Sequence, residues 1–120
     1  MASMRKYIDG LAVLAVGLCL VALPARAVRA QDAKQQYEKS CNMCHGPAGK
    51  GDGPAGKMLK PPPADFAAVL KGKADADIAK IIKEGGKAVG KSAAMPAFGS
   101  KLKDDQIQAL VEYLKGFASK

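Results

Sequence analysis

One five-residue run constrains this chain more than any other feature: Cys41-Asn42-Met43-Cys44-His45. The spacing C-x-x-C-H is the attachment signature of c-type haem. Two thiols so spaced can bond to the two vinyl groups of one porphyrin, and the histidine that follows can bind the iron from the same turn. Outside the first 30 residues there is no other cysteine, and His45 is the single histidine. We therefore interpret Cys41 and Cys44 as covalent haem c attachment sites and His45 as an axial ligand.

Three other uses of this run are weaker. A zinc site needs four ligands, usually cysteine and histidine, whereas this chain offers three, with Asp52 the nearest further candidate. A thioredoxin-type pair belongs to a strand-to-helix turn, and the sequence contains no convincing strand. A structural disulfide leaves the adjacent histidine unexplained.

The N-terminus has the layout of a secretory signal peptide. Arg5 and Lys6 precede an uncharged apolar run over residues 10–23, which Pro24 ends. That run has 14 residues, whereas a membrane-spanning helix needs about 20, so removal of a leader is favoured over an uncleaved anchor. We expect no stable membrane insertion after cleavage.

The small residues around the end of this segment favour cleavage after Ala30, with Ala27 as the alternative. The sequence therefore divides into a leader, 1–30, and one small domain, 31–120. Export to the periplasm agrees with the chemistry, because c-type haem is attached outside the bacterial cytoplasm and that compartment is oxidising.

The charge of the mature segment is carried by lysine. Residues 31–120 hold 15 lysines and no arginine against 10 acidic residues, a net charge of +5. Without arginine, interleaved aromatic residues or a nucleic-acid motif, nucleic-acid binding is not indicated. The lysines either keep a monomer soluble or steer an acidic redox partner to it.

The predicted fold is all-α, with long glycine- and proline-rich loops that we expect to wrap one covalent haem. Apolar residues recur at helical spacing in the second and third helices. Asp75 is expected to cap the second helix, and Gly85-Gly86 to stop it. The three main helices are predicted over Asp32–Ser40, Ala76–Glu84 and Asp104–Phe117.

A glycine-rich segment follows the haem motif and repeats Gly-Pro-Ala-Gly-Lys over residues 46–50 and 53–57. It imitates a phosphate-binding loop, but Met58 stands where a Walker loop has serine or threonine, and no strand precedes it. We interpret it as a flexible turn.

The second axial ligand of the iron cannot be another histidine of this chain. Met95 is the favoured candidate, because it precedes Pro96 and so belongs to an extended loop. Its thioether is a soft ligand that favours reduced iron. Met58 is the rival, while Met43 lies inside the attachment turn and is disfavoured; ordinary packing is the plain alternative role for Met95.

Together, Cys41-Asn42-Met43-Cys44-His45-Gly46 and Met95-Pro96-Ala97-Phe98 resemble the class I c-type cytochromes, small monohaem electron carriers. The resemblance covers nearly all of residues 31–120. It implies thioether bonds at the two cysteines, and His45 and Met95 as the axial ligands of one haem c.

The resemblance also implies contacts around the haem. The first and last helices are expected to cross, with Ala33 and Tyr37 facing Leu110 and Tyr113. A backbone carbonyl of Pro61, Pro62 or Pro63 is expected to accept a hydrogen bond from the proximal histidine. Many relatives have serine or threonine at the position of Lys103, so the N-cap role is expected to pass to Asp104.

The sequence favours a periplasmic electron carrier that is not an enzyme. A peroxidase-like or gas-binding haem protein needs a displaceable sixth ligand and usually a polar acid–base group, and the sole histidine is already used. A third alternative is a small cytochrome subunit of a larger oxidoreductase complex.

Overall fold

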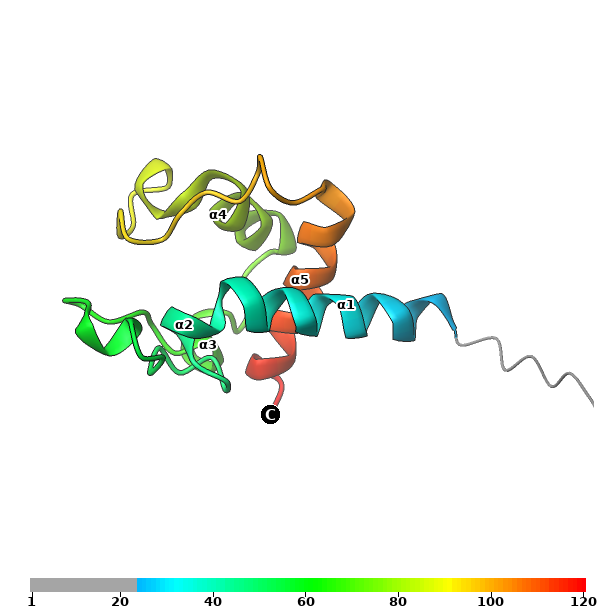
Figure 1. The fold of residues 1–120 in the computed structure, drawn as a ribbon, viewed down its shortest axis with the longest axis horizontal. Helices are drawn as coiled ribbons and strands as arrows, with labels where there is room; N and C mark the ends of the chain where they lie inside the picture. Colours follow the sequence, from blue (N-terminus) through cyan, green and yellow to red (C-terminus); the bar gives the residue numbers. More distant parts are fainter. Residues whose placement is uncertain (1–23) are drawn as a thin grey trace, which may run out of the picture.

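Apolar residues at helical spacing build two of the three long helices of this protein, Asp75–Ala88 and Asp104–Ala118, in a computed structural model that describes residues 24–120 (Figure 1). Within those residues the fold is all-α and contains no strand, which confirms the predicted fold class. The apolar core of the predicted leader lies outside the described residues. The elements are α1 (Ala25–Ser40), α2 (Asn42–His45), the 3₁₀ turn η1 (Gly56–Met58), α3 (Phe66–Val69), α4 (Asp75–Ala88) and α5 (Asp104–Ala118).

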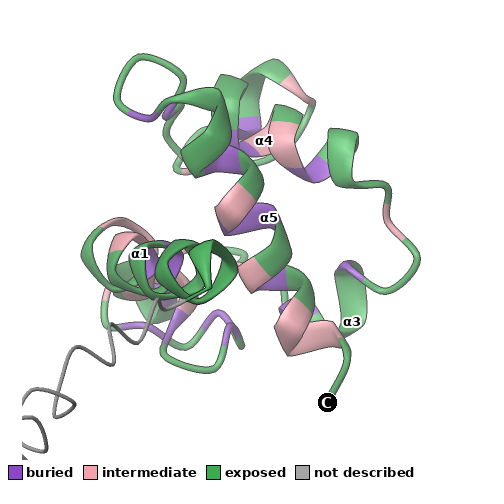
Figure 2. Cartoon of the chain, turned by 90° about the vertical axis from the view of Figure 1, so that its right-hand side faces the viewer, coloured by how far each residue is buried: buried purple, intermediate pink, exposed green. Residues whose placement is uncertain are grey.

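The crossing of α1 and α5 is the centre of the core (Figures 1 and 2). Ala33 and Tyr37 are the buried residues of α1. The rings of Tyr37 and Tyr113 lie 5.3 Å apart, and Leu110 is buried on the same helix as Tyr113. The helix contact implied by the family resemblance is therefore present.

The first helix begins earlier than predicted, at Ala25 rather than at Asp32. Its first residues are all exposed, and Ala33 is the first buried residue of the described chain. Local helix preference extends the segment, although no buried contact holds it. Among the described helices, none is both long enough and apolar enough to cross a membrane.

The second long helix, α4, differs from the prediction at its start. Ala74 is the N-cap residue and Asp75 is the first helical residue, so the predicted capping role of Asp75 is wrong. The carboxylate of Asp75 instead accepts a hydrogen bond from Lys115 on α5. Gly85 interrupts the helix with φ 80° and ψ 169°, where a stop was predicted.

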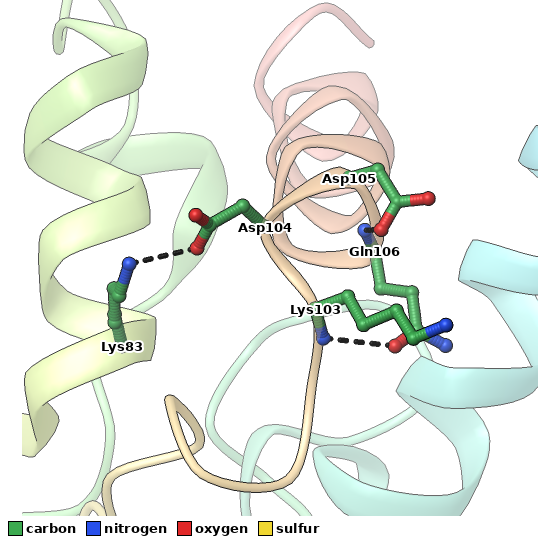
Figure 3. Close-up of polar contacts among 5 residues, drawn as sticks. All are labelled: Lys83, Lys103, Asp104, Asp105 and Gln106. Carbon is green, nitrogen blue, oxygen red and sulfur yellow. Dashed lines mark hydrogen bonds and ion pairs between the residues drawn. The ribbon is translucent and has the colours of Figure 1, made fainter.

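The last helix, α5, is capped by Lys103 and not by Asp104 (Figure 3). The side-chain oxygen of Gln106 accepts a hydrogen bond from the backbone N–H of Lys103 at 2.9 Å. This bond fixes the start of the helix from its third residue, which is why a lysine is tolerated at the cap. Asp104 turns outward and pairs with Lys83 of α4 at 2.7 Å.

Candidate haem site

The haem-motif residues form a single helical turn directly after α1. The N–H groups of Cys44 and His45 both donate to the carbonyl of Cys41, at 3.1 and 2.9 Å. The hydroxyl of Tyr37 donates to the carbonyl of Gly46 at 2.6 Å. The buried end of α1 therefore holds the C-terminal end of the motif in place.

The glycine-rich segment behind the motif is a packed element, so the prediction of a flexible turn describes it poorly. Gly51 and Gly53 donate to the carbonyls of His45 and Cys44, at 2.9 and 3.2 Å. A Cβ atom on Gly56 would lie 2.0 Å from the carbonyl oxygen of Cys44. Only glycine permits this close approach of backbone to backbone.

One cavity of about 340 Å³ brings the predicted site residues together. Its lining includes Cys41, Cys44, His45 and Met95, together with the segment Pro61–Pro63. The two other methionines near the motif are not on this lining. Met58 is 81% exposed and Met43 is 61% exposed, and both side chains point to solvent.

His45 lies against Phe66 on the wall of the cavity, with ring centroids 4.5 Å apart. Burial lowers the pKa of its imidazole, which keeps the ring neutral and able to bind a metal ion. Its Nδ1 atom is buried and has no hydrogen-bond partner among the described residues. The bond expected from this histidine to a carbonyl of Pro61–Pro63 is therefore not made through Nδ1.

Both motif cysteines carry free thiols. Burial, and secondarily the charge of Cys44, raises the pKa of Cys41 to about 11, so its thiol is protonated at neutral pH. Across residues 24–120, no three histidine, cysteine, aspartate or glutamate side chains come together in a way that could hold a metal ion. The zinc alternative therefore has no ligand set in the described chain.

Met95 reaches the cavity on a loop that is hydrogen bonded to the end of α4. Its carbonyl accepts from the N–H of Gly86 at 3.0 Å. A Cβ atom on Gly85 would lie 3.0 Å from that same carbonyl oxygen, and one on Gly86 would lie 2.0 Å from the carbonyl oxygen of Ser92. The sequence predicts Gly85 and Gly86 as a helix stop. Because they lack side chains, they also let the backbone of the loop that carries Met95 pack closely against α4.

These residues fit a haem c group. The cavity walls are mostly apolar, the two thiols lie on them, and a buried imidazole nitrogen lacks a partner. A thioether and a neutral imidazole are a common axial pair for haem iron.

A small all-α domain of this kind, with C-x-x-C-H at the end of its first helix and a Met-Pro loop beside its last, defines a class I c-type cytochrome. The sequence profile of the family described as "Cytochrome C oxidase, cbb3-type, subunit III" matches residues 28–114. The chain belongs to this cytochrome c family, whose domain implies haem c and electron transfer. No curated protein matches the chain.

Proposed function

We propose that residues 31–120 form an exported electron carrier with one haem c, bonded to Cys41 and Cys44 and ligated by His45 and Met95. One observation carries the proposal: a single cavity unites these four side chains and leaves Met58 outside. In bound form, haem supplies an iron that takes one electron from a donor protein as Fe(III) and gives it to an acceptor as Fe(II).

The chain's own groups attach and tune that cofactor. With haem bound, Cys41 and Cys44 would each add its thiol across one vinyl group. The sulfur would bond to one vinyl carbon and the thiol hydrogen would go to the other, so that no external oxidant or reductant is needed. As an axial ligand, the Met95 thioether would stabilise the reduced state of the iron and raise the reduction potential.

The surroundings of Met95 favour a carrier over an enzyme. Ile82 and Phe98, both buried, line the cavity next to it, and Ala94 and Pro96 flank it in the chain. A peroxidase-like reaction needs a side chain that moves protons beside the sixth position. The sequence has one histidine, and the proposal uses it as the axial ligand on the other side of the iron. We therefore assign no catalytic residue.

Export through the leader is part of the proposal. The candidate cleavage positions after Ala27 and Ala30 both lie in the exposed part of α1, before the first buried residue, Ala33. Removing residues 1–30 would leave the α1–α5 contact intact. The mass of the protein purified from periplasm should correspond to a chain that starts at Gln31, or at Val28 for the alternative.

The partner we propose is an acidic redox protein. Five exposed lysines lie on loops and helix ends between the haem motif and Met95: Lys50, Lys57, Lys60, Lys87 and Lys91. Exposed charges act over about 8–10 Å at ordinary ionic strength. Reversing Lys57 and Lys60 to glutamate should slow association and flatten its salt dependence, while Lys120→Glu should not. If Lys120→Glu slows association as much as reversal of Lys57 and Lys60, the lysines serve solubility in general and do not form a docking surface.

A second candidate is a small cytochrome subunit of a larger oxidoreductase, which the description of the matched family favours. Native gel electrophoresis of mild-detergent extracts separates the two. A free carrier runs as a small haem-staining band, whereas a subunit runs with a large assembly.

Covalent attachment gives the direct test of the main proposal. The purified protein should keep its haem through acid-acetone extraction and denaturing electrophoresis. Replacing Cys41 and Cys44 with alanine should make any bound haem extractable. Extractable haem in the unaltered protein would contradict the proposal.

A further inference from the structure

The wall of the haem cavity carries charge at two places only. Among its lining residues, Lys73 and Lys91 are the two charged side chains, and there is no aspartate, glutamate or arginine. The rest of the lining is mostly apolar. A lysine beside an apolar cavity lays its methylene stem on the wall and needs an anion or water for its ammonium group.

Both lysines are held at the cavity by their backbones. The N–H of Lys73 donates to the carbonyl of Leu70 at 3.0 Å, and the N–H of Lys91 donates to the carbonyl of Gly86 at 2.7 Å. Leu70 and Gly86 line the same cavity. The two lysines thus flank α4, one before its start and one after its end.

Neither ammonium group has an anionic partner among residues 24–120. The ion pairs of that part of the chain join Lys34 to Glu38, Lys83 to Asp104 and Lys115 to Asp75. Lys73 is half-buried, whereas Lys91 lines the cavity from an exposed position at its rim. Two unpaired cations on a mostly apolar wall match a flat apolar ligand that carries two carboxylates, and haem has two propionates.

We propose that Lys73 and Lys91 bind the two propionate carboxylates of the haem. This inference rests on the proposed function, because it requires haem in the cavity. The other titratable groups on the lining are Cys41, Cys44 and His45; thioether bonds and iron ligation would occupy them. The lysines therefore set the electrostatic environment of the propionates.

The pairing has two measurable consequences. A positive charge beside the haem favours the reduced state, so its loss should lower the reduction potential at pH 7. A carboxylate titrates near pH 4.3 in water, and a neighbouring cation lowers that value by about 1–3 pH units. The fall of the potential with rising pH accompanies carboxylate ionisation. Loss of the cation should therefore shift the pH at which the potential falls to a value about one pH unit higher.

The test measures reduction potential from pH 3 to pH 8 on protein shown to hold covalent haem. Lys73→Gln and Lys91→Gln should show the lowered potential and the upward-shifted titration, and Lys73→Arg should keep the unaltered profile. Lys71→Gln and Lys87→Gln remove the same charge from exposed neighbours that are not on the lining, so they are the matched controls.

The outcomes separate the two proposals. Covalent haem with lysine variants that match their controls would overturn the propionate assignment and leave the carrier intact. An unaltered protein that lacks covalent haem would overturn both. If Lys73→Gln accumulates without haem while Lys71→Gln and Lys73→Arg retain it, that loss itself supports the assignment.

Discussion

The α1–α5 crossing and the glycine segment (residues 46–63, the glycine-rich repeat with the proline run that follows it) both lie against the haem motif, yet they are built in different ways. The crossing consists of side chains: Tyr37, Leu110 and Val111 are each no more than 1% exposed. The glycine segment consists of backbone, since a Cβ atom on Gly51 would lie 1.8 Å from the carbonyl oxygen of Pro63. Substitutions in the crossing should therefore lower the free energy of unfolding in proportion to the side-chain volume that they remove. In the glycine segment, any side-chain atom added at a glycine should lower it.

The largest effect is expected in the crossing. Leu110→Ala removes a fully buried side chain and should lower the free energy of unfolding by about 2–5 kcal/mol, through lost burial and the cavity left behind. Gln108→Ala, an exposed position on the same helix, should stay within about 0.5 kcal/mol. Chemical denaturation of the haem-loaded protein measures both. Equal midpoints for the two variants would mean that the crossing is not the core.

For the glycine segment, the comparison is between one of its glycines and a glycine outside it that has nearly the same φ. Gly51 has φ +75° with Pro63 against it, whereas Gly72 has φ +74° with nothing within 4 Å. Gly72→Ala should cost about 1–2 kcal/mol for the left-handed conformation alone. Gly51→Ala should cost about 1–3 kcal/mol more, because the added methyl overlaps the proline carbonyl. Similar losses of stability for the two would show that the close approach does not constrain the segment.

Tyr37 joins the two regions, so its hydroxyl tests their connection. Tyr37→Phe removes this bond, while the carbonyl of Gly46 still accepts from the N–H of Gly49 at 3.2 Å, so the change should cost about 0.5–1.5 kcal/mol. Tyr113→Phe is the matched control, since its hydroxyl makes no hydrogen bond within residues 24–120. A destabilisation of Tyr113→Phe as large as that of Tyr37→Phe would assign the effect to ring packing instead.

The smallest effect is expected outside both regions, at Lys83–Asp104, one of two ion pairs that join α4 to α5. Lys83 and Asp104 are exposed, at 51% and 81% of their side chains, although they lie only 2.7 Å apart. A double-mutant cycle with Lys83→Met and Asp104→Asn should give a coupling below about 1 kcal/mol that falls with added salt. A larger coupling that persists in salt would show that this pair, and not apolar packing, holds α4 on α5.

The same contrast explains what the sequence could predict. Helical spacing places Ile78, Ile82 and Leu110 on buried faces, and the family pattern places Ala33 against α5, because such signals are local or repeat across relatives. The packing of the glycine segment depends on which distant carbonyl approaches each glycine, as Pro63 approaches Gly51. The spacing of residues in the sequence does not show which carbonyl will lie against which glycine. For this reason the sequence predicts a flexible turn where the structure has a packed segment.

The cap errors have a similar origin. Lys103 caps α5 because Gln106 reaches back to its N–H, a bond made by a side chain three residues later. Asp75 pairs with Lys115, which is 40 residues away in the chain. For the candidate site, the motif predicted Cys41, Cys44 and His45, whereas no local signal marked Lys73 as a residue of the cavity wall.

The central claim is that iron sits between His45 and Met95, and the absorption spectrum of the oxidised protein tests it most directly. Methionine sulfur bound to ferric haem gives a weak long-wavelength charge-transfer band. The account predicts this band in the unaltered protein, its loss in Met95→Ala, and its retention in the matched control Met58→Ala, whose side chain is 81% exposed. Retention in Met95→Ala together with loss in Met58→Ala would contradict the account and give the ligand role to Met58.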